Sequence, residues 1–147
     1  MGILLDTTFL LPTLGIDVGK EVEASIKKLS EIGAEMYYSR FSILEALWVA
    51  GNLMKNKSFD MERFNLGLRS IIRGGRYKKV EEDSKVFKDA LELYAMGHRD
   101  IIDNLLYASS VNLNLKLLTL DVEFREFIGD KGLKDTLLFP DQIDRSN

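Results

Sequence analysis

Short apolar segments alternate with longer amphipathic segments along this chain, and that alternation limits the folds open to it. Short apolar runs predict buried strands, and apolar residues three and four positions apart predict helices. The predicted strands cover residues 2–5, 36–38, 77–80, 115–119 and 136–139, of which 77–80 also fits a loop. The predicted helices cover residues 20–32, 39–54, 60–73, 84–97, 101–113 and 124–128. Strands joined through helices pair in parallel and are covered on both faces. We therefore expect an α/β fold, a three-layer sandwich around a small parallel sheet.

The size and hydropathy of the chain favour one domain that does not enter a membrane. Its 147 residues are 46% hydrophobic, enough for one core, and we interpret residues 1–147 as a single domain. The longest stretch without a charged residue is 104–115, only 12 residues, whereas a membrane span needs about 20 apolar residues. The N-terminus has no basic segment, and Asp6 interrupts its apolar run, so we expect no signal peptide and a cytoplasmic location.

The scarcity of cysteine and histidine restricts the chemistry. The chain has no cysteine and one histidine, His98, which excludes disulfides, thiolate nucleophiles and paired histidines. A hydrolase of this composition uses carboxylates, hydroxyls, lysines or a metal held by oxygen, and oxygen ligands suit Mg²⁺ or Mn²⁺. We interpret His98 as a helix-end residue close enough to Asp103 to touch a phosphate. The net charge of −3 means that any surface for nucleic acid is local.

Four acidic residues lie where apolar neighbours predict burial: Asp6, Glu45, Asp103 and Asp121. Asp6 and Asp121 directly follow predicted strands, and ligands of an open parallel sheet bind at the carboxyl ends of its strands. The helices that carry Glu45 and Asp103 are able to lean over the same edge. Clustered carboxylates repel one another unless they take up protons or bind a cation. The set therefore predicts a divalent metal site suited to hydrolysis of phosphate esters.

Each acid by itself also has a simpler interpretation. Asp121 fits the N-cap of the following helix, and Asp6 fits the start of a turn. Asp103 is spaced to pair with Arg99, and Glu45 fits a solvent-facing line of its helix. The metal-site hypothesis therefore depends on the four acids as a set.

The segments around the four acids resemble the PIN domain family, small metal-dependent nucleases that include VapC-type toxins. The matching segments are Leu4 to Leu10, Ser42 to Leu47, Asp103 to Ser110, and Leu117 to Phe124, which carries a T-x-D-x-x-F pattern. The resemblance implies five parallel strands and one or two Mg²⁺ or Mn²⁺ ions held by the four acids. It further implies cleavage of single-stranded RNA with a 5′-phosphate product, a homodimer, and inhibition by a small antitoxin protein.

Further residues are candidates for supporting roles near the acids. Thr8 and Thr119 are placed to orient Asp6 and Asp121 by hydrogen bonds, although both also suit strand ends. Asp100 and Glu123 are candidate ligands through water, with a helix first turn as the alternative for Asp100. Asn104 is either a contact to substrate or metal-bound water, or a surface amide.

The stretch from 69 to 79 is basic. Its candidate RNA contacts are Arg69, Arg73, Arg76, Lys78 and Lys79, with Tyr77 as a possible stacking face. A solvated helix end explains the same residues.

Two other functions fit parts of the pattern. In a phosphatase of the haloacid-dehalogenase type Asp6 is the nucleophile, but such enzymes usually need a second aspartate at the position held here by Thr8. A non-catalytic PIN-like module for RNA or protein keeps the acids for structure alone.

Overall fold

The five predicted strands form one parallel sheet in the computed structural model, which describes residues 2–56 and 58–145. The strands are β1 (Gly2–Leu5), β2 (Glu35–Tyr38), β3 (Tyr77–Lys79), β4 (Lys116–Leu118) and β5 (Leu137–Leu138). The helices are α1 (Lys20–Glu31), α2 (Arg40–Met54), α3 (Met61–Arg73), α4 (Ser84–Ala95), α5 (Ile101–Asn112) and α6 (Val122–Asp130). Two 3₁₀ helices, η1 (Thr7–Phe9) and η2 (Pro140–Arg145), were not predicted.

Side-chain caps fix where several helices begin. The Ser39 hydroxyl accepts a hydrogen bond from the backbone N–H of Phe41 and starts α2. Asp60 caps α3 and Asp83 caps α4 in the same manner. Each cap satisfies a backbone donor that the first helical turn leaves without a partner.

The strand order creates one place where a ligand site is favoured. The order is β3-β2-β1-β4-β5, with every neighbouring pair parallel. The chain builds outward from β1 through β2 to β3, then crosses back to place β4 on the other side of β1. The connections therefore diverge between β1 and β4, and in such sheets this divergence opens a crevice at the carboxyl ends of the strands.

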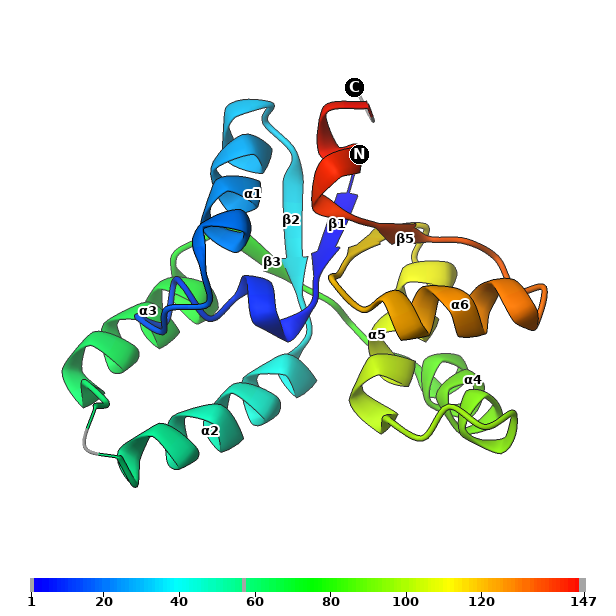
Figure 1. Ribbon diagram of the computed structural model, residues 1–147, viewed down its shortest axis with the longest axis horizontal. Coiled ribbons are helices and arrows are strands. Elements are labelled where there is room, and N and C mark those ends of the chain that lie inside the picture. The colour runs from blue at the N-terminus through cyan, green and yellow to red at the C-terminus, as the bar shows by residue number, and fades with distance from the viewer. Residues whose placement is uncertain (1, 57, 146–147) are drawn as a thin grey trace.

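Alternate residues of the strands other than β3 pack into two different cores. Ile3 and Leu5 of β1 belong to a core shared with α1 and α3, whereas Leu4 belongs to a second core shared with α5 and α6. Figure 1 shows α1 and α3 on one side of the sheet and α4, α5 and α6 on the other. The expected three-layer sandwich is confirmed, and its two layers of helices hold β1 and β4 in the middle.

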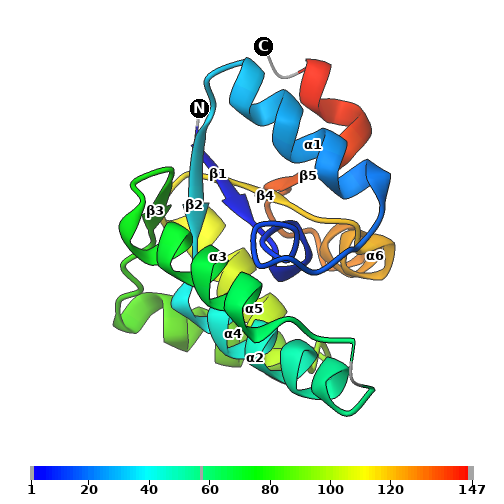
Figure 2. The ribbon, with the colours of Figure 1, turned by 90° about the vertical axis from the view of Figure 1, so that its left-hand side faces the viewer.

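Helix α2 extends beyond the sheet and leaves apolar side chains in solvent. Figure 2 shows it below the strands. Trp48 has 60% of its surface exposed, and Leu44 and Leu47 beside it are exposed as well. A helix that is apolar all round is usually buried, so this surface is a candidate for contact with another chain. Among the described residues, no helix is long and apolar enough to cross a membrane.

Candidate active site

Two of the four predicted acids lie side by side at the crevice between β1 and β4. Asp6 follows the last residue of β1, and its backbone N–H donates to the carbonyl of Leu118 at the end of β4 (3.0 Å). Asp121 follows β4 after a two-residue extension. Pairing between the two strands therefore brings together residues that are far apart in the sequence. Glu45 stands in the second turn of α2 and Asp103 in the first turn of α5.

Thr119 joins the Asp6 and Asp121 segments. Its hydroxyl donates to Oδ2 of Asp6 (3.1 Å) and accepts from the backbone N–H of Asp121 (3.1 Å). The side chain is buried, so both bonds are shielded from water. This geometry supports the predicted orienting role of Thr119. The corresponding expectation for Thr8 differs from the structure: within the described residues, Asp6 bonds instead to the backbone N–H of Thr7, through Oδ1 (2.7 Å).

Helix N-termini surround the acids. Asp121 caps α6 through the N–H of Phe124 (3.0 Å), and Asp6 caps η1. Asp100 caps α5 through the N–H of Asp103 (3.1 Å). The partial positive charge of a helix N-terminus favours carboxylates nearby and offsets part of their repulsion. Capping by Asp121 is thus compatible with a site role, because it occupies one oxygen and leaves the other.

Burial and the charges of neighbouring acids raise the pKa values of two of the four acids, Asp6 and Asp103. Burial raises the pKa of Asp6 to about 6, aided by the charges of Glu45 and Asp121 and opposed by the hydrogen bonds from Thr119 and Thr7. Burial likewise raises the pKa of Asp103 to about 8, with further contributions from Asp6, Asp100, Asp121 and Glu45. Four carboxylates in one another's field are stabilised by a shared cation.

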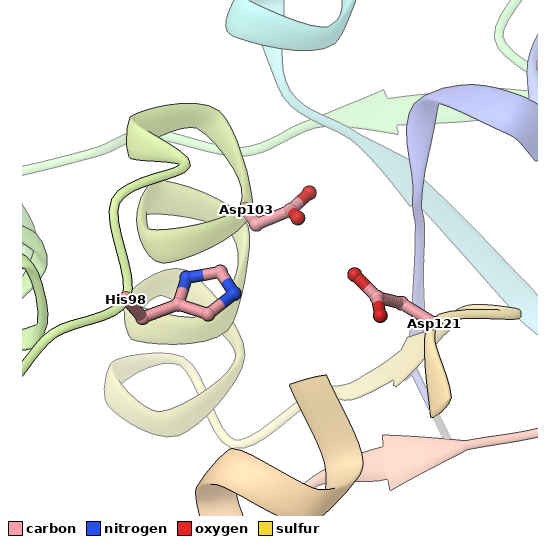
Figure 3. Close-up of side chains that lie close together, drawn as sticks. All are labelled: His98, Asp103 and Asp121. Atoms are coloured by element: carbon pink, nitrogen blue, oxygen red, sulfur yellow. The ribbon is translucent and has the colours of Figure 1, made fainter. Parts of the chain in front are cut away.

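The tightest group at this site includes a residue that the sequence did not predict as a ligand. One ligand atom each of His98, Asp103 and Asp121 lies within 4.8 Å of the other two, and Figure 3 shows these side chains converging from α5 and its preceding loop and from the end of β4. The sequence offered one indication of this role, because His98, the only histidine of the chain, stands five residues before the predicted ligand Asp103. Asp6 and Glu45 lie outside this group, but their charges help to raise the pKa of Asp103.

The remaining supporting candidates occupy different environments. Asn104 is fully buried and bonds to His98, which excludes the surface-amide interpretation. Asp100 is exposed and engaged as a helix cap, and Glu123 is exposed in the first turn of α6. Water-mediated roles for Asp100 and Glu123 stay predictions. The guanidinium of Arg99, the residue that the sequence spaced to pair with Asp103, lies over the Tyr94 ring.

The predicted basic stretch lies on α3 and on the edge strand β3, two strands from Asp6. Lys78 pairs with Glu35 (2.8 Å) and Lys79 with Glu81 (3.4 Å). Arg76 donates to the hydroxyl of Ser30 and lies over the Tyr77 ring.

Tyr77 itself is only 4% exposed, and its hydroxyl bonds to that of Thr13, so the proposed stacking face is wrong. Arg69 and Arg73 are exposed on α3. A role of these basic residues in RNA contact stays a prediction.

A family model decides the classification. The model of the PIN domain matches residues 3–129 of the chain. The chain belongs to the PIN domain family. PIN domains are generally nucleases, and the crevice at β1 and β4 is the candidate active site of this PIN domain.

Solved structures show the same PIN fold at low sequence identity. A toxin–antitoxin complex from Klebsiella pneumoniae matches with a TM-score of 0.60 and 14% identity over 94% of this chain and 97% of the other. VapBC2 from Rickettsia felis, bound to a DNA fragment from its promoter, matches with a TM-score of 0.60 and 15% identity over 95% of this chain and 97% of its own. FitAcB from Neisseria gonorrhoeae matches with a TM-score of 0.60 and 17% identity over 94% of this chain and 97% of its own. No curated protein matches the chain.

Proposed function

We propose that this PIN domain is a metal-dependent ribonuclease that hydrolyses phosphodiester bonds of single-stranded RNA in the cytoplasm. The observation that carries the proposal is the gathering of Asp6, Glu45, Asp103 and Asp121 at a crevice where the connections of a parallel sheet diverge, where burial and neighbouring charge raise the pKa values of Asp6 and Asp103. All four are carboxylates, the donors that Mg²⁺ and Mn²⁺ prefer. The donor set therefore fits the cofactor.

The residues around the crevice have separable tasks in this proposal. Asp6, Glu45, Asp103 and Asp121 hold one or two Mg²⁺ or Mn²⁺ ions. When bound, such an ion lowers the pKa of water and stabilises negative charge on the phosphate. Thr119 keeps the Asp6 carboxylate and the Asp121 backbone in fixed relation, so that the ligands need little rearrangement to bind.

Substrate contacts are proposed outside the acids. Arg69 and Arg73, both exposed on α3, are proposed to contact RNA phosphates. Arg76, Lys78 and Lys79 exchange their present partners for phosphate only when RNA is bound.

The test of the proposed function is the metal requirement of RNA cleavage. Purified chain incubated with a fluorescent single-stranded RNA is expected to cut it in Mn²⁺ or Mg²⁺, to stop in excess chelator, and to leave 5′-phosphate ends. Asp130→Asn, a change at an exposed acid at the end of α6, serves as the matched control and keeps full activity. Equal cleavage with chelator present would contradict the proposal.

The two alternative functions have less support. The phosphatase interpretation treats Asp6 as a nucleophile, but both Asp6 oxygens accept hydrogen bonds, from Thr7 and Thr119, and the family is the PIN domain rather than the haloacid dehalogenases. A non-catalytic module would gain nothing from a carboxyl whose pKa is raised to about 8, because burial of such a group opposes folding when it ionises.

We further propose that this nuclease is the toxin of a toxin–antitoxin pair and forms a homodimer. The structures that share its fold include a toxin–antitoxin complex and VapBC2. Exposed apolar residues of α2 and α4, Trp48 and Leu91 foremost, offer surface for partners. Light scattering is expected to give twice the mass of one chain. Coexpression with the product of a neighbouring short gene is expected to give a stable complex without RNA cleavage. A monomer that no neighbouring product binds would refute this assignment.

A further inference from the structure

His98 is held in place from several directions at the edge of the acidic crevice. Its backbone N–H donates to the carbonyl of Leu93 (3.1 Å), and its own carbonyl accepts from the side chain of Asn104 (2.7 Å). The imidazole stacks on the Phe124 ring, with centroids 4.3 Å apart and planes at 15°, and Phe127 lies against it at 5.2 Å. The ring therefore has one well-defined orientation.

Asn104 determines which ring nitrogen carries the proton. The amide nitrogen of Asn104 faces two backbone carbonyls, those of His98 (2.7 Å) and Ala90 (3.4 Å), which can only accept hydrogen bonds. The amide oxygen consequently faces Nδ1 of His98, at 2.7 Å. An amide oxygen only accepts, so Nδ1 is the donor, and in the neutral ring the lone pair resides on Nε2.

The free nitrogen is directed at the acids. One ring nitrogen lies within 4.8 Å of an oxygen of Asp103 and of Asp121. Because Asn104 engages Nδ1, Nε2 is the nitrogen that is free to act as a ligand. Figure 3 shows one ring nitrogen pointing toward the space between the two carboxylates. A histidine that donates through Nδ1 to a buried oxygen while presenting Nε2 to a cluster of carboxylates has the arrangement of metal-bound histidines in proteins.

We propose that His98 is a nitrogen ligand of the metal at this site, fixed in its Nε2-coordinating tautomer by Asn104. The inference rests on the proposed metal-dependent function and specifies its cofactor. Imidazole is a poor ligand for Mg²⁺ and a good one for transition metals. A site of aspartates and His98 therefore selects Mn²⁺ over Mg²⁺, and Asn104 acts as a positioning residue that keeps the nitrogen aimed at the ion.

The decisive experiment is spectroscopic and uses the wild-type chain without an affinity tag. His98 is the only histidine, so any imidazole nitrogen coupled to a bound metal belongs to it. Electron spin-echo spectroscopy of the Mn²⁺-loaded protein is expected to show nitrogen-14 modulation from a coordinated imidazole. In the metal-free protein, long-range ¹⁵N NMR is expected to show the proton on Nδ1. Bound Mn²⁺ without nitrogen modulation, or a proton on Nε2, would overturn the proposal.

Affinity measurements on variants give an independent readout. His98→Gln is expected to weaken Mn²⁺ binding about tenfold while leaving Mg²⁺ binding nearly unchanged, so that the preference for Mn²⁺ shrinks. Asn104→Leu removes the acceptor for Nδ1 and is expected to have a smaller effect in the same direction. Asp6→Asn is the contrasting control, because loss of a carboxylate weakens both metals. Equal losses for both metals in His98→Gln would count against a ligand role.

The outcomes separate this inference from the function on which it rests. Mn²⁺ that binds without nitrogen coupling and still supports RNA cleavage refutes the His98 assignment alone. If neither Mn²⁺ nor Mg²⁺ binds, both the His98 assignment and the proposed metal-dependent function are refuted. If a variant does not fold, the spectra of the wild-type protein still decide the question.

Discussion

Asp6→Asn is expected to lower RNA cleavage by at least about a thousandfold and, at the same time, to stabilise the metal-free protein. A ligand to the proposed ion contributes several kcal/mol of transition-state stabilisation, and each 1.36 kcal/mol corresponds to tenfold in rate. Asparagine has nearly the same shape: its Oδ1 accepts from the N–H of Thr7, and its amide N–H donates to the Thr119 oxygen, so the second contact is kept with its direction reversed. The activity loss therefore does not come from a disrupted fold.

The stability gain comes from the removal of a disfavoured charge. Burial and the neighbouring carboxylates raise the pKa of Asp6 to about 6, so ionisation at pH 7.5 opposes folding. We expect a gain of about 1 to 2 kcal/mol at that pH, a rise in Tm of roughly 2–8 °C. At pH 4 Asp6 is protonated in the folded protein and the gain disappears. Calorimetry at both pH values, with Asp130→Asn as control, checks this. An Asp6→Asn protein that is less stable at pH 7.5 would contradict the electrostatic account.

The metal-free protein is expected to lose stability as the pH rises from 5 to 8. The folded-state pKa values of Asp6 and Asp103 are about 6 and about 8, against an ordinary value of 3.8. In this window the folded protein holds protons that the unfolded chain has released, so the free energy of unfolding falls with rising pH. We expect a loss on the order of 3 kcal/mol. The matched variant, Asp6→Asn combined with Asp103→Asn, is expected to give a nearly flat profile.

Saturating Mn²⁺ is expected to reverse the slope of that profile. The ion binds deprotonated carboxylates, so its binding releases protons and strengthens as the pH rises. Because the ion binds the folded state, its contribution to stability grows with affinity. Urea unfolding at several pH values, with and without Mn²⁺, measures both effects. A protein whose stability rises with pH in the absence of metal would contradict the raised pKa values of Asp6 and Asp103 and the electrostatic account based on them.

Local sequence patterns were sufficient for the fold class and for most element boundaries. The run from Gly2 to Leu5 ends at Asp6 and forms β1, and Gly33, at φ 69°, lies just beyond the C-cap of α1. Hydroxyls at both Ser39 and Ser42 fit an N-cap of α2, and only the backbone conformation at Ser39 decides between them. The 3₁₀ helix after Asp6 was missed because a single turn has no apolar period to detect.

For the site, too, some residues could be predicted from the sequence and others could not. Hydroxyls beside Asp6 and Asp121 were recognisable from the sequence, but whether Thr8 or Thr119 reaches Asp6 depends on the pairing of β1 with β4, which no local pattern encodes. The exposure of Trp48 could not be predicted from the sequence either, because an apolar stripe has the same pattern whether another helix of the chain packs on it or solvent contacts it.

The sequence by itself determined that this chain forms a parallel sheet with helices on both faces and carries acids at its strand ends, because periodicity, caps and apolar runs are local properties. Only the tertiary structure decided that His98 directs a ring nitrogen at Asp103 and Asp121 and that Asn104 holds this ring in place. Their contacts depend on how α5 and α6 pack against one another, and the orientation of the His98 ring follows from bonds to Asn104 and stacking on Phe124. Local patterns predict what each segment becomes, whereas long-range packing determines which side chains meet.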